Sequence, residues 1–226
     1  MNLDDVVRFL NFWVNKYLGA YFTPEEICDA LDGGQMSYYT DIKGKYATST
    51  EIKQILSPFK RTYEFTPSNT ISGYVVVPSN VDYLDFLDMQ IEVDISSRIL
   101  YTPVEIVSED TRAERLNSQI DPVTVSNPIA EIMADRYFKM YPVSGYRGII
   151  TYLKRPVKPV YGFNTISGRV IVYDPATSTQ LEWRQTDLQP LMLKALVSLG
   201  VNLSAPDLQQ FAAVKTTDNY NNKNRM

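Results

Sequence analysis

The residues in this chain whose types and spacing best suit chemistry are neighbouring carboxylates. They form three pairs, Asp4/Asp5, Glu25/Glu26 and Asp85/Asp88. Paired carboxylates can act as general acid and base, or hold a hard metal ion through oxygen. Two of the pairs stand where the N-terminus of a helix favours negative charge, which is a structural role. We therefore expect no catalytic residues, and an enzyme that uses carboxylates alone remains a third alternative.

Histidine is absent from the chain, and Cys28 is the single cysteine. Without histidine the chain lacks the commonest general base and transition-metal ligand, so Ser-His and Cys-His chemistry is excluded. One cysteine can form neither an intrachain disulfide nor a cysteine-based zinc site. Cys28 lies between Ile27 and Ala30 and is expected to be a small buried hydrophobe. We expect no metal and no cofactor.

A loose basic region with aromatic neighbours is the other feature that could bind a ligand. It consists of Lys43, Lys45, Lys53, Lys60, Arg61, Tyr46 and Phe59. Such mixtures can hold single strands, so a non-catalytic single-strand nucleic-acid-binding protein is the alternative function. A solvated charged face explains the same residues. The net charge of −4 argues against tight wrapping of nucleic acid, and Gly33-Gly34 lacks the surroundings of a phosphate-binding loop.

The composition is that of an ordinary folded protein. The 226 residues are 44% hydrophobic and 21% charged, enough for a large core and unlike a disordered chain. No apolar run approaches the ~20 residues that span a bilayer, so no membrane contact is expected. The acidic opening is unlike a signal peptide, and an intracellular, reducing origin fits. The 16 tyrosines fit protein contact surfaces, although half-buried strands also collect tyrosine.

Helices are predicted near both ends of the chain. Apolar spacing over residues 3–18 predicts an amphipathic helix that ends at Gly19. Thr23-Pro24-Glu25-Glu26 is a capping box that starts a second helix, which we expect to continue across Gly33-Gly34 to Ile42, with a break at Gly33 as the alternative. Residues 50–56 predict a short helix, and residues 188–199 predict the best one, closed by Gly200. Residues 206–214 predict a weak helix after it.

The middle of the chain has the period of β-strands. We expect strands or hairpins over residues 59–65, 73–77, 86–95 with 98–101, 103–107, 129–133 with 137–141, 149–153 and 168–173, and a short helix over residues 110–117 capped by Ser108. The fold class is therefore α+β, with helices at the two ends and a β-rich antiparallel middle. We divide a single structural domain into residues 1–57, 58–184 and 185–214, followed by a flexible tail over 215–226.

A short segment that joins two predicted strands is the sharpest local feature. Residues 154–159, Lys-Arg-Pro-Val-Lys-Pro, place Lys154, Arg155 and Lys158 on a stiff stretch that sheet pairing cannot fully cover. This basic segment fits two roles equally well. It is an ordinary edge protected by lysine and proline against aggregation, or it is a contact between subunits.

Several blocks of the chain together resemble the head–tail connector, or ring, proteins of crAss-like and related Bacteroidetes-infecting podoviruses. They are YLKRPVKPVYG at 152–162, YDPATSTQLEW at 173–183, LGVNL at 199–203, Glu109-Asp110 with RLNSQI at 115–120, and the opening helix pair with TPEE at 23–26. The blocks have no chemical content, so their combination and order carry the resemblance. Gly33-Gly34 departs from the helical continuation usual in that family.

The resemblance implies a virion structural protein at the head–tail junction, made in the cytoplasm of the host bacterium. It implies a homo-oligomeric ring of twelve copies beneath the portal protein, next to other tail-ring or tail-tube proteins, in loose contact with the genomic DNA that passes through. In related adaptors the C-terminal segment commonly reaches the portal. This makes Tyr220 the candidate anchor of the tail, and Lys223 and Arg225 its candidate charge contacts. An unattached solubilising tail is the alternative.

Deletion of residues 215–226 tests the role of the tail. The segment is polar and cannot bury enough surface to order itself in a monomer, so the melting curve of the isolated subunit should not change. A weak segment repeated around a ring gains from effective concentration, so the truncated protein should fail to join portal-bearing heads. Normal assembly of the truncated protein into infectious particles would place the portal contact in the body of the fold.

Overall fold

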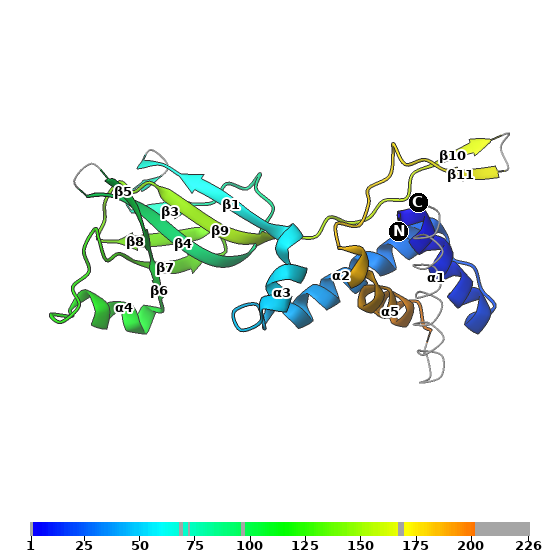
Figure 1. The fold of residues 1–226 in the computed structure, drawn as a ribbon, viewed down its shortest axis with the longest axis horizontal. Helices are drawn as coiled ribbons and strands as arrows, with labels where there is room; N and C mark the ends of the chain where they lie inside the picture. Colours follow the sequence, from blue (N-terminus) through cyan, green and yellow to red (C-terminus); the bar gives the residue numbers. More distant parts are fainter. Residues whose placement is uncertain (1, 68–69, 72, 96–97, 167–169, 202–226) are drawn as a thin grey trace. The chain divides into compact units, whose positions relative to one another are not determined.

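The computed structural model describes residues 2–67, 70–71, 73–95, 98–166 and 170–201. The fold is α+β, with helices towards both ends of the described chain and a β-rich middle of mainly antiparallel strands (Figure 1). The chain forms two compact units. The β unit comprises residues 59–155, and it is inserted into the helical unit, which comprises the residues before and after it.

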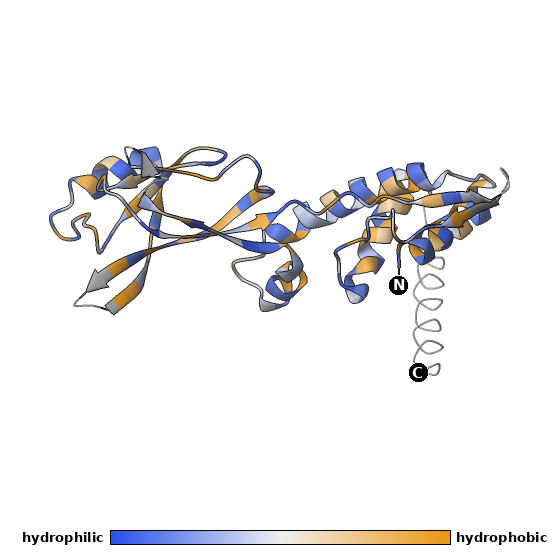
Figure 2. Ribbon diagram, turned by 90° about the horizontal axis from the view of Figure 1, so that it is seen from above, coloured by the Kyte–Doolittle hydropathy of each residue, from blue (hydrophilic) through white to orange (hydrophobic). Residues whose placement is uncertain are grey.

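The helical unit contains four α-helices and a two-stranded ribbon among its described residues. They are α1 (Leu3–Leu18), α2 (Pro24–Lys43), α3 (Thr50–Ile55), α5 (Leu188–Ser198), β10 (Phe163–Ile166) and β11 (Val170–Tyr173), with 3-10 turns at Ser57–Phe59 and Gln185–Asp187. Hydrophobic and hydrophilic residues alternate along these helices (Figure 2). Their apolar faces meet, and Leu10, Trp13, Leu31 and Leu196 are almost fully buried.

Local signals fix the ends of these helices as the sequence predicts. Thr23 and Glu26 form the predicted capping box of α2, each side chain accepting a hydrogen bond from the backbone of the other, and Pro24 is the first helical residue. Gly200 ends α5 with φ +84°. The Gly200 N–H donates to the Val197 carbonyl, and the Val201 N–H donates to the Leu196 carbonyl. These are the two hydrogen bonds of a Schellman motif.

The paired glycines of α2 lie within one continuous helix, as the sequence predicts, and the alternative, a break at Gly33, does not occur. A Cβ built on Gly34 would lie 3.0 Å from both the Ala195 nitrogen and the Leu191 oxygen of α5. At Gly33 it would meet nothing within 4 Å. Gly34 is therefore the residue that lets α5 approach the backbone of α2.

The β unit contains two sheets. One has the order β1-β9-β4-β5, and all its neighbours are antiparallel: β1 (Lys60–Phe65), β9 (Gly148–Lys154), β4 (Tyr83–Ile95) and β5 (Arg98–Pro103). The other has the order β2-β3-β8-β7-β6: β2 (Thr70–Ile71), β3 (Tyr74–Val76), β8 (Tyr137–Tyr141), β7 (Ile129–Ala134) and β6 (Glu105–Val107). Residues of both sheets share one core, which includes Met89, Ile91, Ile150, Val75, Phe138 and Met140.

One expectation for the β unit needs correction. We expected residues 103–107 to continue the preceding strand, but Pro103 ends β5 and β6 joins the other sheet. The Val104 N–H still donates to the Met89 carbonyl of β4 at 2.9 Å, and the chain changes sheet directly after it, where Glu105 pairs with Ile129 of β7. β6 and β7 then pair in parallel, and α4 (Glu109–Leu116) connects them, because parallel neighbours need a crossover.

The grouping of the chain also differs from the sequence-based one. Residues 156–184, which we placed in the β-rich middle, belong to the compact unit formed by the helices. The predicted strand over 168–173 is observed as Val170–Tyr173, with its first residues outside the described ranges. The predicted helix over residues 206–214 and the tail over 215–226 also lie outside them.

Substitution of Gly33 and Gly34 by alanine, one at a time, separates the effect of helix propensity on stability from the effect of packing against α5. Gly33→Ala should raise the free energy of unfolding by about 1 kcal/mol, because its Cβ enters open space and alanine favours a helix. Gly34→Ala should lower it by about 1–3 kcal/mol, because the new methyl group presses on the backbone of α5. Urea unfolding of both variants measures the difference. Equal effects at the two positions would show that α5 does not approach α2 at Gly34.

Candidate functional site

The basic segment, residues 154–159, is where the chain leaves the β unit for the helical unit. Lys154 is the last residue of β9 and lies opposite Tyr83 of β4. Arg155 is exposed, and its N–H donates to the Asp82 carbonyl at 3.3 Å. Lys158 lies in the helical unit and forms a 2.6 Å ion pair with Asp29 of α2. The structure thus divides the three predicted contact residues between two units.

Within the helical unit the basic segment is held along α2. The Val157 carbonyl accepts a hydrogen bond from Gln35 Nε2 at 3.0 Å, and the Val157 N–H donates to Glu182 Oε2 at 3.2 Å. Pro156 and Pro159 are buried while Lys158 is exposed. The hydrogen bond with Asp29 raises the pKa of Lys158 above its usual value, so the cation is retained at neutral pH. The remaining predicted contacts, Tyr220, Lys223 and Arg225, lie outside the described residues.

A buried polar contact that sequence reasoning missed joins α2 to residues 182–184. Gln35 is fully buried, and its Oε1 accepts a 3.2 Å hydrogen bond from Trp183 Nε1. The ring of Trp183 also lies 5.2 Å from that of Tyr38. The sequence indicates only that Gln35 is in phase with the apolar residues of α2 and is therefore expected to be buried. It does not indicate that Trp183 is its hydrogen-bond partner.

A second polar contact between distant segments lies at the base of the β10–β11 ribbon. Tyr161 Oη donates to Asp4 Oδ1 at 2.7 Å, and its ring lies 5.0 Å from that of Tyr173. Burial, and then the hydrogen bond with Asp4, raises the pKa of Tyr161 to about 12, so it stays protonated. Gly162 is buried so tightly against Thr177 that no side chain would fit. Asp4 thus has a role beyond that of a helix-end charge, because it also anchors the ribbon.

Beyond this base the ribbon presents apolar side chains to solvent. β10 and β11 pair with each other and with no third strand among the residues that the structure describes. Phe163 is 41% exposed and Val172 is 42% exposed. Phe163 pairs with Tyr173 and Val172 with Asn164, so the two apolar side chains lie on opposite faces. A two-stranded ribbon is only marginally stable alone, and its apolar faces fit a contact surface.

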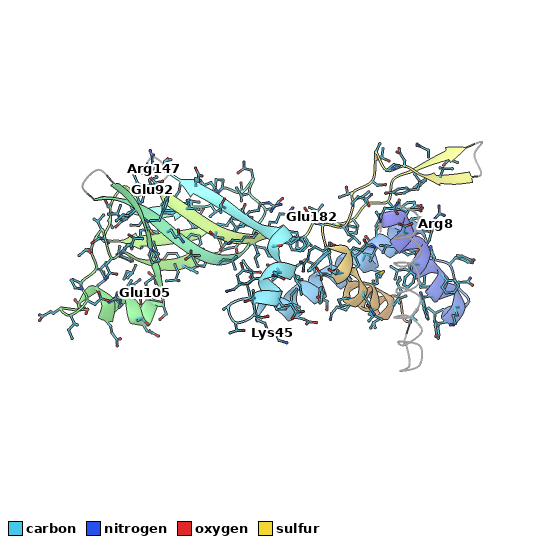
Figure 3. The ribbon with its side chains drawn as sticks, in the orientation of Figure 1. Arg8, Lys45, Glu92, Glu105, Arg147 and Glu182 are labelled. Atoms are coloured by element: carbon cyan, nitrogen blue, oxygen red, sulfur yellow. The ribbon has the colours of Figure 1, made fainter. Side chains whose placement is uncertain are left out.

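A braced loop follows α4 in the β unit. Arg115 pairs with Glu105 at 2.8 Å and with Asp121 at 2.7 Å, and Glu105 is marked in Figure 3. Asn127 Nδ2 also donates to Asp121 Oδ1 at 2.7 Å. These bonds fix a loop on which Ile120 is 99% exposed. A fixed loop that presents a bare aliphatic side chain is the kind of feature found at protein interfaces.

The features that suggested chemistry have structural roles in the described chain. Glu26 belongs to the α2 capping box, and Gln90 Nε2 donates to Asp88. In the hollow of about 480 Å³ beside α4, Glu131 is paired with Arg112 at 2.6 Å. No group of three histidine, cysteine, aspartate or glutamate residues in the described chain could hold a metal ion.

The remaining expectations about binding concern Cys28, the basic region and membranes. Cys28 is buried as expected, and burial raises the pKa of its thiol to about 11. Phe59 is fully buried and therefore unable to stack on a base, which weakens the nucleic-acid alternative. Lys43, Lys45 and Lys53 belong to one unit, and Lys60 and Arg61 to the other. Among the described helices, none is both long and apolar enough to cross a membrane.

Comparison with known proteins finds no protein-family model that matches the chain and no curated protein that matches its sequence.

The buried contact between Gln35 and Trp183 can be tested by substitution. Gln35→Leu should lower the free energy of unfolding by about 1–3 kcal/mol, because it leaves the Trp183 N–H and the Val157 carbonyl without this partner. Gln54→Leu, on the exposed side of α3, is the matched control and should have little effect. A double-mutant cycle with Trp183→Phe should give a coupling of about 0.5 kcal/mol or more, measured by urea unfolding. Strictly additive effects would show that the two side chains do not interact.

Proposed function

We propose that the chain is a virion structural protein, a subunit of the head–tail connector ring beneath the portal of a bacteriophage. The observation that carries the proposal is the β10–β11 ribbon, whose base is fixed by partly buried hydrogen bonds and whose strands present Phe163 and Val172 to solvent. A ribbon of this kind suits a subunit that reaches a neighbour, because the partner covers apolar surface that water would otherwise contact.

The sequence blocks that resemble connector proteins support the proposal from another side. Two of them contain the residues that join the parts of the helical unit. Tyr161 of the first block and Tyr173 of the second pack at the base of the ribbon, and Trp183 of the second is buried against α2. The blocks therefore coincide with packing determinants of this fold. A resemblance carried by packing determinants is expected when two proteins share an architecture rather than a reaction.

The partners follow from this role. They are further copies of the chain in a ring, the portal protein, adjacent tail-ring or tail-tube proteins, and genomic DNA in loose contact. The net charge of −4 suits a channel in which DNA slides without being held, because like charge does not attract phosphate. The basic segment contributes Lys154, Arg155 and Lys158 as candidate contacts to the portal or a neighbouring subunit.

Addition of the labelled protein to portal-bearing heads without tails tests the proposal. We expect electron microscopy to find the label at a single vertex of each head, as a closed ring of fixed copy number. Phe163→Ser with Val172→Ser should abolish this binding while leaving the melting temperature unchanged, because both side chains are exposed.

The matched control is Phe12→Ser, which removes a 59% exposed phenylalanine from α1, outside the ribbon. This variant should bind heads as the unmodified protein does. Label spread over the head surface, or absent from portal-bearing heads, would overturn the proposed function. Binding of the ribbon variant at full occupancy would remove the ribbon as its basis.

A further inference from the structure

The open edge of the four-stranded sheet is a surface that the ribbon does not explain. β5 is an edge strand of this sheet, and Ile99, which is 64% exposed, is followed by the exposed Leu100 and Tyr101. Edge strands are usually protected by charged residues, proline or bulges, because their unpaired backbone groups recruit other strands. Pro103, the last residue of β5, is one such protection, but over residues 99–102, all within the described chain, β5 has none.

The hydrogen-bond pattern identifies the backbone groups on this edge. The Val104 N–H donates to the carbonyl of Met89, its opposite residue in the β4–β5 register, at 2.9 Å. Alternate residues of an antiparallel strand turn their N–H and C=O groups to opposite sides. Ile99 and Tyr101, an odd number of residues from Val104, therefore point their backbone groups away from β4 and into the open edge.

The other edge of the same sheet, β1, presents a matching set of groups. The Glu92 N–H donates to the Arg147 carbonyl at 2.8 Å. Residues of β9 that lie an even number of positions from Arg147 therefore direct their backbone groups to β4, and the residues between them direct theirs to β1. In the β1–β9 register this leaves Lys60, Thr62 and Glu64 with their backbone groups towards the open edge of β1. β1 and β5 are both six residues long.

We infer that β5 of one copy pairs in antiparallel fashion with β1 of a second copy, so that the four-stranded sheets of neighbouring subunits join edge to edge. The inference rests on the proposed function, because it names the contact between subunits of that ring. Full overlap places Tyr101 opposite Thr62, and Ile99 opposite Glu64, of the second copy. These are the residues whose backbone groups face the two edges, so full overlap satisfies the hydrogen-bond pattern of an antiparallel pair.

Strand direction and side-chain faces agree with this pairing. Each strand of the sheet is antiparallel to its neighbour, so β1 and β5 run in opposite directions and an added β1 continues the alternation. On the outer face, Tyr101 Oη donates to Glu92 Oε1 at 3.2 Å, and Glu92 lies beside Arg147 (Figure 3). Thr62 and Glu64 share this face in the register, while Leu100 and Tyr63 share the core face.

The geometry of the sheet also favours β1 as the occupant. Within one copy Tyr101 lies opposite Glu92, and Thr62 is aligned through Thr151 with Asp88, so the two edges are offset by four residues along β4. This is about 14 Å over four strand spacings that total about 19 Å. This corresponds to a tilt of about 35°, at the lower end of the range of closed barrels, so repeated addition is compatible with a ring.

Disulfide cross-linking tests the pairing. Protein with Tyr101→Cys and Thr62→Cys is assembled on portal-bearing heads and oxidised, and we expect a ladder of covalent multimers on a non-reducing gel. Cys28 should stay reduced, because it is buried and its thiol is protonated. The control pair Tyr101→Cys with Tyr63→Cys places one thiol on the other face of the sheet and should give no ladder.

Each other outcome has a defined meaning. If the Tyr101→Cys and Thr62→Cys protein forms a ring at the vertex but gives no ladder of covalent multimers, the pairing of β5 with β1 is overturned and the proposed function stays intact. Absence of the unmodified protein from the vertex would overturn the proposed function as well. Cross-linked dimers from Tyr101→Cys alone would show that β5 pairs with β5 of the second copy, which closes a dimer and contradicts the inference.

Removal of a single backbone donor provides a second test. Ile99→Pro eliminates an N–H that faces the open edge and not β4, so the subunit should keep its melting temperature. Its affinity for portal-bearing heads should fall by about tenfold or more. Ile99→Val keeps the donor and a β-branched side chain, and should assemble normally. Full assembly of a folded Ile99→Pro protein would show that the β5 edge is not used.

Discussion

The side-chain amide of Gln35 is the interaction on which the helical unit depends most. It donates to Asp32 and to the Val157 carbonyl and accepts from Trp183, so one buried group joins α2 to two segments far along the chain. A buried amide costs free energy unless its donors and acceptor are satisfied, so these segments must pack in one arrangement. The positions of Lys158 and of the ribbon base follow from that arrangement.

Local signals in the sequence predicted much of the fold. The capping box at Thr23 and Glu26, the glycine that ends α5 and the period-two hairpins each depend on neighbouring residues, so one chain is enough to recognise them. The continuity of α2 across its glycines was also predictable, because the apolar phase does not change there. These features reproduce the α+β class and most element boundaries.

The features that depend on distant residues could not be predicted. Nothing near Asp4 in sequence indicates Tyr161, and nothing near Gln35 indicates Trp183, because these contacts arise only when the tertiary fold is complete. The change of sheet at Pro103 depends likewise on which strands lie alongside. For the same reason the sequence assigned Lys154, Arg155 and Lys158 to one surface, whereas the chain passes between two units within that segment.

The insertion of the β unit into the helical unit also orders events during synthesis of the chain. Lys60 pairs with Leu153, so the β unit begins and ends at adjacent points and can fold as soon as residue 155 has left the ribosome. α2 has no such independence, because α5 lies more than a hundred residues later. The part of α2 that α5 covers therefore stays exposed while the whole insert is translated, so the helical unit completes its core only after the β unit has been made.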